Sequence, residues 1–303
     1  MRYLILSLMI LTTGCSLQKL TADQTADALY TGQSAMESEE DIEFARTALP
    51  GSLKTVETFL QSSPENEKFL EMLAKGYFSY AFGFIEWDLE RAEIGAAEEE
   101  TIDLLRSRAV IHYMRSSAFG WRLLDNEDVQ KAATSGNRGA LVKALKTETD
   151  VDDVPGLFWA AYGWGAAINL SQDNPDMVAQ QELVVAMMER VVELDADYFF
   201  GGPLLFFAVY HLSVPPALGG KPEKAKQYFD SAMKRFGNKN LLVPYLGARF
   251  YAATMQDAPL FKSLLNRVKS ADLDAYPNLR LNNAIAKERA IFWLKNSDEL
   301  ILE

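Results

Sequence analysis

The residues of this sequence that could carry out chemistry are few and lie far apart along the chain. The two histidines, His112 and His211, have no cysteine near them, because Cys15 is the only one. A zinc site needs several such ligands, so we expect no metal ion and no other cofactor. Ser231 and Lys234 have the Ser-x-x-Lys spacing of penicillin-recognising enzymes, but the companion Lys-Thr-Gly motif is absent. We therefore expect that the protein is not an enzyme.

A glycine-rich stretch, residues 219–221, also fails as a site for phosphate. The glycine required five places before Gly220 is Pro215, and Pro222 stands where a serine or threonine would bind magnesium. Paired acidic residues such as Asp152–Asp153 are expected to cap helices, because carboxylates accept hydrogen bonds from the free N–H groups of a helix start. No set of nucleophile, base and orienting group emerges from the sequence.

The composition predicts a folded chain with a large apolar core and an acidic surface. The chain has 303 residues, of which 49% are hydrophobic and 24% are charged, and its net charge is −12. Nucleic acids and anionic membrane surfaces attract clusters of Lys and Arg, and the sequence shows no Lys/Arg-rich patch. We expect no nucleic acid partner and no attachment to a membrane by charge.

The first fourteen residues have the pattern of a targeting segment. Arg2 is followed by an apolar run, residues 3–11, that is too short to span a bilayer. A lone cysteine after a small residue at this place resembles the lipobox of a bacterial lipoprotein, although an ordinary signal peptide with an incidental cysteine has the same outline. We expect residues 1–14 to be the signal peptide, Cys15 to carry a lipid anchor, and residues 15–35 to tether a single all-helical domain, residues 36–303.

The longest helix of the N-terminal half is predicted over residues 66–92 and is unusually rich in aromatic residues. Apolar residues recur along it at helical spacing, so the helix should be buried on most sides. Core packing explains most of these rings, and the surplus suggests that some line a cavity. One face carries Leu73, Tyr77, Tyr80, Phe84 and Trp87, and the other carries Phe78, Phe82, Ile85 and Leu89.

The rest of the chain reads as helices with no strand. We predict an all-α fold of roughly a dozen helices in antiparallel pairs, with a loop rich in aromatic residues at 198–203. The further helices are expected over residues 97–124, 126–146 (broken at 135–136), 156–170, 177–194, 204–212, 222–235, 242–255, 259–269 and 279–294.

The helix predicted to begin at Pro222 has the residue spacing of a repeat protein. Pro222 suits the first turn of a helix, and Ala225, Phe229 and Ala232 then follow on one stripe. This is the pattern of the second helix of a tetratricopeptide (TPR) repeat. At the 34-residue period of such repeats, Leu-Gly-x2-Phe at residues 246–250 takes the place of the next first helix. The prediction is a cryptic TPR-like α-solenoid or bundle.

Together, these features resemble one family. The lipobox, the aromatic helix, the Pro-Ala-Leu-Gly-Gly-x-Pro-Glu-Lys-Ala stretch of residues 216–225 and the TPR phase are similar to TatT, the TPR-containing lipoprotein component of TRAP transporters. The resemblance is strongest over residues 69–87, 215–235 and 241–265, whereas Pro259 departs from the alanine of the repeat. It implies a periplasmic protein on the inner or outer membrane, a TRAP-type substrate-binding protein as partner, a homotrimer, and a pore or cleft that passes a hydrophobic ligand.

Three aromatic segments carry the candidates for contact with that ligand. They lie within residues 77–87, 158–164 and 198–200, and a continuous apolar cavity touching at least two of them is required if the protein conducts a ligand. The alternative is a general TPR scaffold lipoprotein of envelope assembly with a polar groove for a peptide. The candidate ligand-binding residues are Tyr80, Trp87, Trp159, Trp164, Phe199 and Tyr210.

Overall fold

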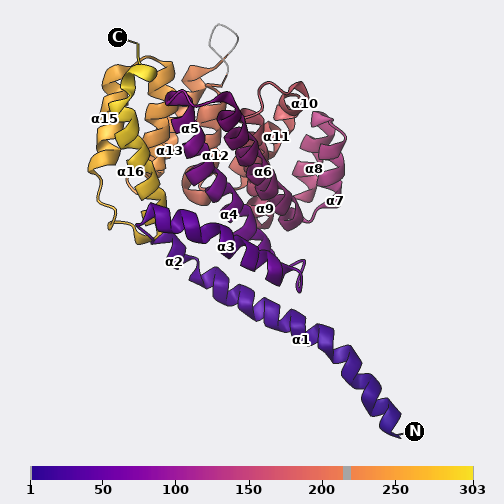
Figure 1. Ribbon diagram of the computed structural model, residues 1–303. Coiled ribbons are helices and arrows are strands. Elements are labelled where there is room, and N and C mark those ends of the chain that lie inside the picture. Colours follow the sequence, from indigo (N-terminus) through magenta and orange to yellow (C-terminus); the bar gives the residue numbers. More distant parts are fainter. Residues whose placement is uncertain (1, 214–219, 303) are drawn as a thin grey trace.

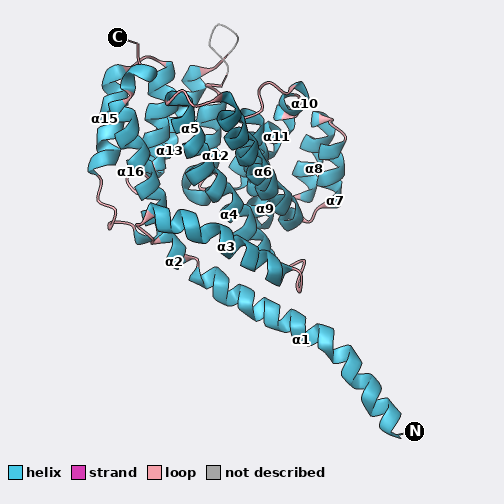
Figure 2. Cartoon of the chain, viewed as in Figure 1, coloured by secondary structure: helices cyan, strands magenta, loops and turns pink. Residues whose placement is uncertain are grey.

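The computed structural model describes residues 2–213 and 220–302, with side chains from Leu17 onward, and within these ranges it contains helices and no strand (Figures 1 and 2). The prediction of an all-α fold is confirmed. The expected proline-glycine loop at residues 215–219 lies outside the described residues, as does the side chain of Cys15.

The N-terminal helix α1 (Arg2–Gly32) projects from the body over its first half and docks on it over its second half (Figure 1). Ala22 and Ala26 are buried against the body. Asp23 accepts hydrogen bonds from the Ser63 hydroxyl (2.6 Å) and the Asn66 amide (2.8 Å). The predicted tether therefore packs against the domain through its own side chains.

Two further N-terminal helices, α2 (Ser34–Glu37) and α3 (Ile42–Leu60), lead into the aromatic helix. That helix is one continuous rod made of α4 (Glu67–Tyr80), a π-helical turn η1 (Ala81–Ile85) and α5 (Glu86–Ile94). The Asn66 side chain caps its start by accepting from the Phe69 amide at 3.1 Å. The predicted span of residues 66–92 is confirmed, and the π-helical turn was not foreseen.

The middle of the molecule is built on α6 (Glu99–Leu124) and α9 (Val154–Asn169), which run antiparallel at very short range. A Cβ atom placed on Gly120 would lie 2.2 Å from the Ala160 nitrogen, and one on Gly163 would lie 2.6 Å from the Tyr113 carbonyl oxygen. The Ser117 hydroxyl donates to the Ala160 carbonyl at 2.8 Å. The two backbones are therefore in direct contact.

Shorter helices complete this half on the far side of α9. They match the predicted pair with a break at residues 135–136, whereas the helix predicted over residues 177–194 begins at Gln181 and is preceded by a separate short helix. They are α7 (Glu127–Thr134), α8 (Arg138–Glu148), α10 (Pro175–Val178) and α11 (Gln181–Asp195).

The aromatic loop expected at residues 198–203 is a tight turn at the start of α12 (Tyr198–Tyr210). Phe199, Phe200 and Gly201 have φ angles of 47°, 54° and 83°, in the left-handed region. Such angles are costly for residues other than glycine. The turn redirects the chain so that the remainder of α12 packs against the C-terminal helices.

The C-terminal helices are α13 (Pro222–Phe236), α14 (Leu242–Leu246) with a second π-helical turn η4 (Gly247–Ala252), α15 (Ala258–Ser270) and α16 (Arg280–Lys295). As the spacing predicts, Ala225, Phe229 and Ala232 are buried. The Phe229 ring lies where a side chain on Gly247 would be, 2.0 Å from the Cβ position. This packing fits the predicted helix pairing, and a TPR array remains a prediction.

The contact between α6 and α9 gives the first test. Gly120→Ala forces a methyl group into the α9 backbone, so it should lower the free energy of unfolding by about 1–3 kcal/mol, as overpacking does. Gly51→Ala is the matched control, because a Cβ atom there meets nothing within 4 Å. The control should raise stability by about 0.5–1 kcal/mol, the helix preference of alanine over glycine. Urea unfolding of both variants measures this, and equal effects would contradict the packing.

Candidate functional site

A cavity of about 430 Å³ lies where the N-terminal helices meet the aromatic helix and the C-terminal half. Its walls come from α1, α2 and α3 on one side and from α4, η1, α9, α12, α14 and α16 on the other. Most of the lining is apolar, and it includes Leu53, Phe78, Phe82, Tyr162, Phe199 and Ile285. Cavities of this size and character are typical of sites for small molecules.

The cavity joins the three aromatic segments that the sequence singled out. Phe78 and Phe82 come from the aromatic helix, Tyr162 from α9, and Phe199 and Phe200 from the turn that begins α12. The Phe78 and Tyr162 rings stack with their centroids 4.3 Å apart. The requirement of an apolar cavity touching at least two segments is met by all three.

Of the six candidate residues, Phe199 lines the cavity and Trp159 lies directly behind it. Trp159 is fully buried, and its ring centroid is 4.8 Å from that of Phe199. Trp87 is buried in the core, where its indole N–H donates to Glu288 at 2.7 Å. The structure therefore brings Phe199 and Trp159 together and places Trp87 elsewhere.

The other three candidates are also separate from the cavity lining. Tyr80 packs against Phe84 and His112, and Tyr210 stacks on Phe206. Trp164 lies in a second pocket beside Trp121, and its indole N–H donates to Gln180 at 2.9 Å. A role of the six residues in binding remains a prediction.

The sequence missed the cavity wall that the N-terminal helices supply. Leu29, Met36, Leu49, Leu53 and Val56 line the cavity, but local spacing does not show how these helices pack against the aromatic helix and the C-terminal helices. For Phe78, Phe82 and Tyr162 a signal existed, because Phe78 and Phe82 are four residues apart on one helix face and Tyr162 lies within an aromatic segment.

Polar contacts hold the N-terminal wall in place. Glu37 on α2 forms an ion pair with Lys75 on α4, and both line the cavity. The Tyr30 hydroxyl donates to Glu71 at 2.7 Å, and the Tyr198 hydroxyl donates to the same carboxylate at 3.1 Å. Burial, followed by the hydrogen bond to Glu71, raises the pKa of Tyr30 to about 12. The end of α1 is thus joined through Glu71 to the turn that carries Phe199.

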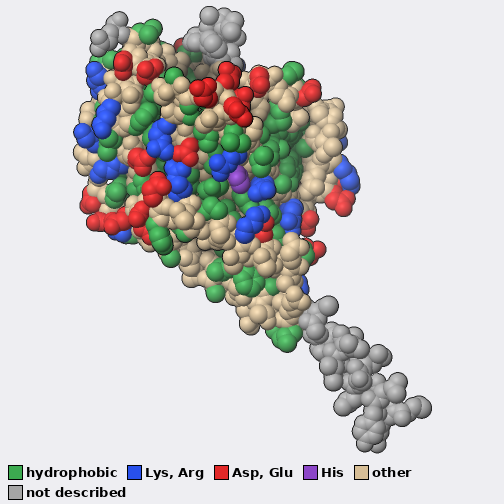
Figure 3. Space-filling model, viewed as in Figure 1, with side chains coloured by type: hydrophobic (Ala, Val, Ile, Leu, Met, Phe, Trp, Pro, Cys, Tyr) green, Lys and Arg blue, Asp and Glu red, His purple; other side chains and the backbone are tan. Residues whose placement is uncertain are grey.

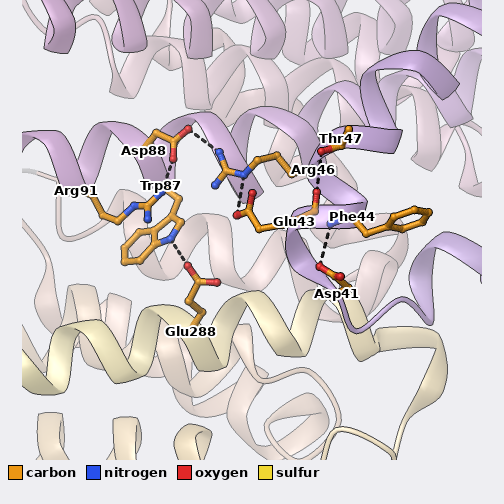
Figure 4. Close-up of polar contacts among 9 residues, drawn as sticks. All are labelled: Asp41, Glu43, Phe44, Arg46, Thr47, Trp87, Asp88, Arg91 and Glu288. Carbon is orange, nitrogen blue, oxygen red and sulfur yellow. Dashed lines mark hydrogen bonds and ion pairs between the residues drawn. The ribbon is translucent and has the colours of Figure 1, made fainter.

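A second set of contacts joins α3, α5 and α16 (Figure 4). Asp88 accepts from Arg46 at 2.6 Å and from Arg91 at 2.5 Å, while Trp87 donates across to Glu288 on α16. Half-buried ion pairs of this kind fix the relative positions of the helices more than they stabilise the fold. They keep α3 and α16, which both contribute to the cavity wall, at a set separation.

Behind the aromatic wall lies a group of ionisable side chains. The Tyr113 hydroxyl donates to the Glu86 carboxylate, and the Tyr113 ring packs on Phe78 at 5.1 Å. Arg289 lies over the Phe82 ring at 4.5 Å and donates to the Phe82 carbonyl oxygen. Some of the Glu86 side chain is still accessible, but protein surrounds its carboxylate densely, and burial raises its pKa from 4.5 to about 7.

The fold and the cavity together define an all-α protein with a mainly apolar pocket where its N-terminal helices meet the aromatic helix and the C-terminal helices. Comparison with known families matches residues 38–301 to the family described as TRAP transporter T-component, so the chain belongs to that family. This family is an accessory of a transport system. No curated protein matches the sequence.

The described residues were also compared with the requirements of a membrane-spanning helix and of a metal site. No helix among residues 2–213 and 220–302 has both the length and the apolar character to cross a bilayer. Within the same residues, no three histidine, cysteine or acidic side chains come together as a group that could hold a metal ion.

The raised pKa of Glu86 gives a prediction for stability against pH. Between pH 4.5 and about 7 the folded state binds the proton of Glu86 more tightly than the unfolded state does. Stability should therefore fall as pH rises through this window, by up to about 3 kcal/mol. Glu86→Gln keeps an acceptor for Tyr113 and should remove this part of the fall.

Unfolding by urea at several pH values measures the effect. Glu99→Gln, an exposed carboxylate on α6, is the matched control for the loss of one acidic group. Parallel stability curves for wild type and Glu86→Gln would show that this carboxylate does not titrate within the window.

Proposed function

We propose that this protein is a membrane-tethered periplasmic accessory component of a TRAP-type transport system that docks the substrate-binding protein and passes a hydrophobic ligand. The observation that carries the proposal is the apolar cavity formed by all three aromatic segments, in a chain that belongs to the T-component family. The homotrimer that the family resemblance implies is part of the proposal.

The chemistry of the cavity wall supports a largely apolar ligand. Burial of apolar surface contributes about 25 cal/mol per Å², and the rings of Phe78, Phe82, Tyr162 and Phe199 are part of that surface together with aliphatic side chains. Polar groups that could orient one end of a ligand are also in the lining, among them Asn240, Asn278 and Asn282. Of the six candidates, Phe199 is positioned for contact, and Trp159 is positioned to support it.

Those asparagines are also the observation that favours the second candidate function. A scaffold lipoprotein would use polar side chains in a groove to bind the backbone of a peptide. The apolar residues in the same wall favour the first function.

The membrane tether in this proposal rests on Cys15 and on helix α1. A lipid on Cys15 would hold the chain at the inner or outer membrane, and α1 would connect the anchor to the body. Because α1 docks next to the cavity through residues such as Tyr30, the tether would place the cavity near the membrane surface.

Blocking the cavity tests the ligand part of the proposal. Ser79 lines the cavity, so Ser79→Trp should fill part of it and weaken binding of the apolar fluorescent probe N-phenyl-1-naphthylamine about tenfold or more. Lys143→Trp, at an exposed position on α8, is the control for an added indole and should bind like wild type. Unchanged binding by a folded Ser79→Trp variant would remove the cavity from the proposal.

The variant Cys15→Ser tests the anchor and the partner together. In cells it should leave the membrane fraction, because no lipid can attach. It should still co-purify with the substrate-binding protein of its TRAP system, because docking belongs to the folded body. A variant that stays with the membrane argues against lipidation, and a wild-type protein that recovers no substrate-binding protein argues against docking.

A further inference from the structure

The outer face of α6 carries a regular stripe of apolar and basic side chains. The stripe consists of Leu104, Arg108, Ile111, Arg115, Ala118 and Arg122, at alternating steps of four and three residues. This is the spacing of one face of a helix that contacts another helix. Figure 3 shows basic and hydrophobic side chains interspersed on the face where Figure 1 places α6.

The apolar members of the α6 stripe are open to solvent to an unusual degree. Leu104 is 59% exposed and Ile111 is 51% exposed, and the adjacent Met114 is 38% exposed. The opposite face of the helix is fully used by the fold, because Ala109, Tyr113 and Gly120 are buried there. Leu104 and Ile111 therefore leave more than half of their surface uncovered among the described residues.

The basic members of the stripe are not held in ion pairs among the described residues, although Arg115 attracts the Glu57 carboxylate, which is itself paired with Lys54. Arg108, Arg115 and Arg122 form no ion pair with any carboxylate among the described residues, although the chain has a net charge of −12. Arg115 lies over the Tyr77 ring at 5.5 Å, and Arg122 lies over Phe119 at 5.6 Å. These contacts hold Arg115 and Arg122 along the stripe, and the Arg122 guanidinium also donates to the Pro64 carbonyl oxygen at 2.7 Å.

His112, next to the stripe on α6, lies in the same positively charged surroundings. Burial, followed by the charges of Arg115, Arg108 and Lys54, lowers the pKa of His112 to about 4. His112 is therefore neutral near pH 7, and the positive charge around it comes from Arg115, Arg108 and Lys54. A stripe of exposed apolar residues flanked by arginines is complementary to an amphipathic helix that carries carboxylates at the same period.

We propose that the α6 stripe is the docking surface for an acidic amphipathic helix of the TRAP substrate-binding protein; this rests on the proposed function. Charge complementarity selects this occupant. The three arginines would pair with carboxylates of the partner helix, and the exposed Leu104 and Ile111 would pack between them.

The test uses the full chain and the substrate-binding protein of its own TRAP system. The double variant Arg108→Glu, Arg115→Glu should weaken binding about 30-fold or more, since it places like charges against the partner. The matched control is Lys262→Glu, Lys269→Glu, which reverses two exposed lysines at the same seven-residue spacing on α15. The control should bind within about threefold of wild type. Wild-type affinity should fall as salt is raised, with a smaller fall for the arginine variant.

A second variant tests the apolar part. Leu104→Ser, Ile111→Ser should weaken binding about tenfold without changing its salt dependence. Both side chains are exposed, so urea unfolding should match wild type for this variant and for the arginine variant.

Four other outcomes would overturn the inference, and each points to a different explanation. If wild type binds the partner and the arginine variant binds equally well, the stripe is not the docking surface and the proposed function stands. If wild type does not bind at all, the docking function fails and the inference fails with it. A changed mass by light scattering, with binding of the partner unaltered, assigns the stripe to self-association. Loss of wild-type binding to phosphatidylglycerol vesicles in the arginine variant assigns it to lipid.

Discussion

The close contact between the backbones of α6 and α9 is the constraint on which the rest of the structure depends. It requires positions without a side chain, and Gly120 and Gly163 supply them. With the helices this close, the Ser117 hydroxyl reaches the Ala160 carbonyl oxygen, and a buried polar group is satisfied. Because α6 also packs on the aromatic helix, the same contact sets how near α9 comes to Phe78. The stacking of Phe78 on Tyr162, and with it one wall of the cavity, follows from two glycines.

The cavity in turn depends on the departures from regular helix. A π-helical turn adds a residue to the helix and changes the direction of the side chains around it, and such turns are frequent at functional sites. The turn at Ala81–Ile85 carries Phe82 and Gly83 into the cavity wall. The left-handed angles at Phe199 and Phe200 bring both of these residues into the cavity lining as well. Regular helices would have been easier to form at both places, so the surrounding packing must hold these conformations.

The sequence predicted the helices well and the cavity in part, for a physical reason. Helix positions depend on local spacing, so Ala225, Phe229 and Ala232 could be recognised as a buried stripe without knowledge of the fold. The aromatic segments could be recognised by composition, but which ring faces the cavity depends on packing between distant segments. Phe199 and Trp164 both stand in aromatic-rich segments of the sequence. Phe199 nevertheless lines the cavity, whereas Trp164 lies beside Trp121 in a second pocket. The apolar spacing of residues 16–60 indicated helices, but it could not show that these helices form a cavity wall. Arginines spaced by seven do not appear as a patch in the chain.

The buried Arg289 and Glu86 behind the cavity act on the shape of the cavity wall. Removing an arginine and a carboxylate from water costs several kcal/mol for each ion, and their attraction repays this only in part. A core of apolar side chains would therefore serve stability at least as well as Arg289 and Glu86 do. What an apolar residue cannot do is donate to the Phe82 carbonyl oxygen, as Arg289 does, within a turn whose hydrogen bonding departs from that of an α-helix. The same guanidinium lies over the Phe82 ring, so one side chain fixes both the backbone and the ring of a residue in the cavity wall. The shape of the cavity, rather than the stability of the fold, is what these charges secure.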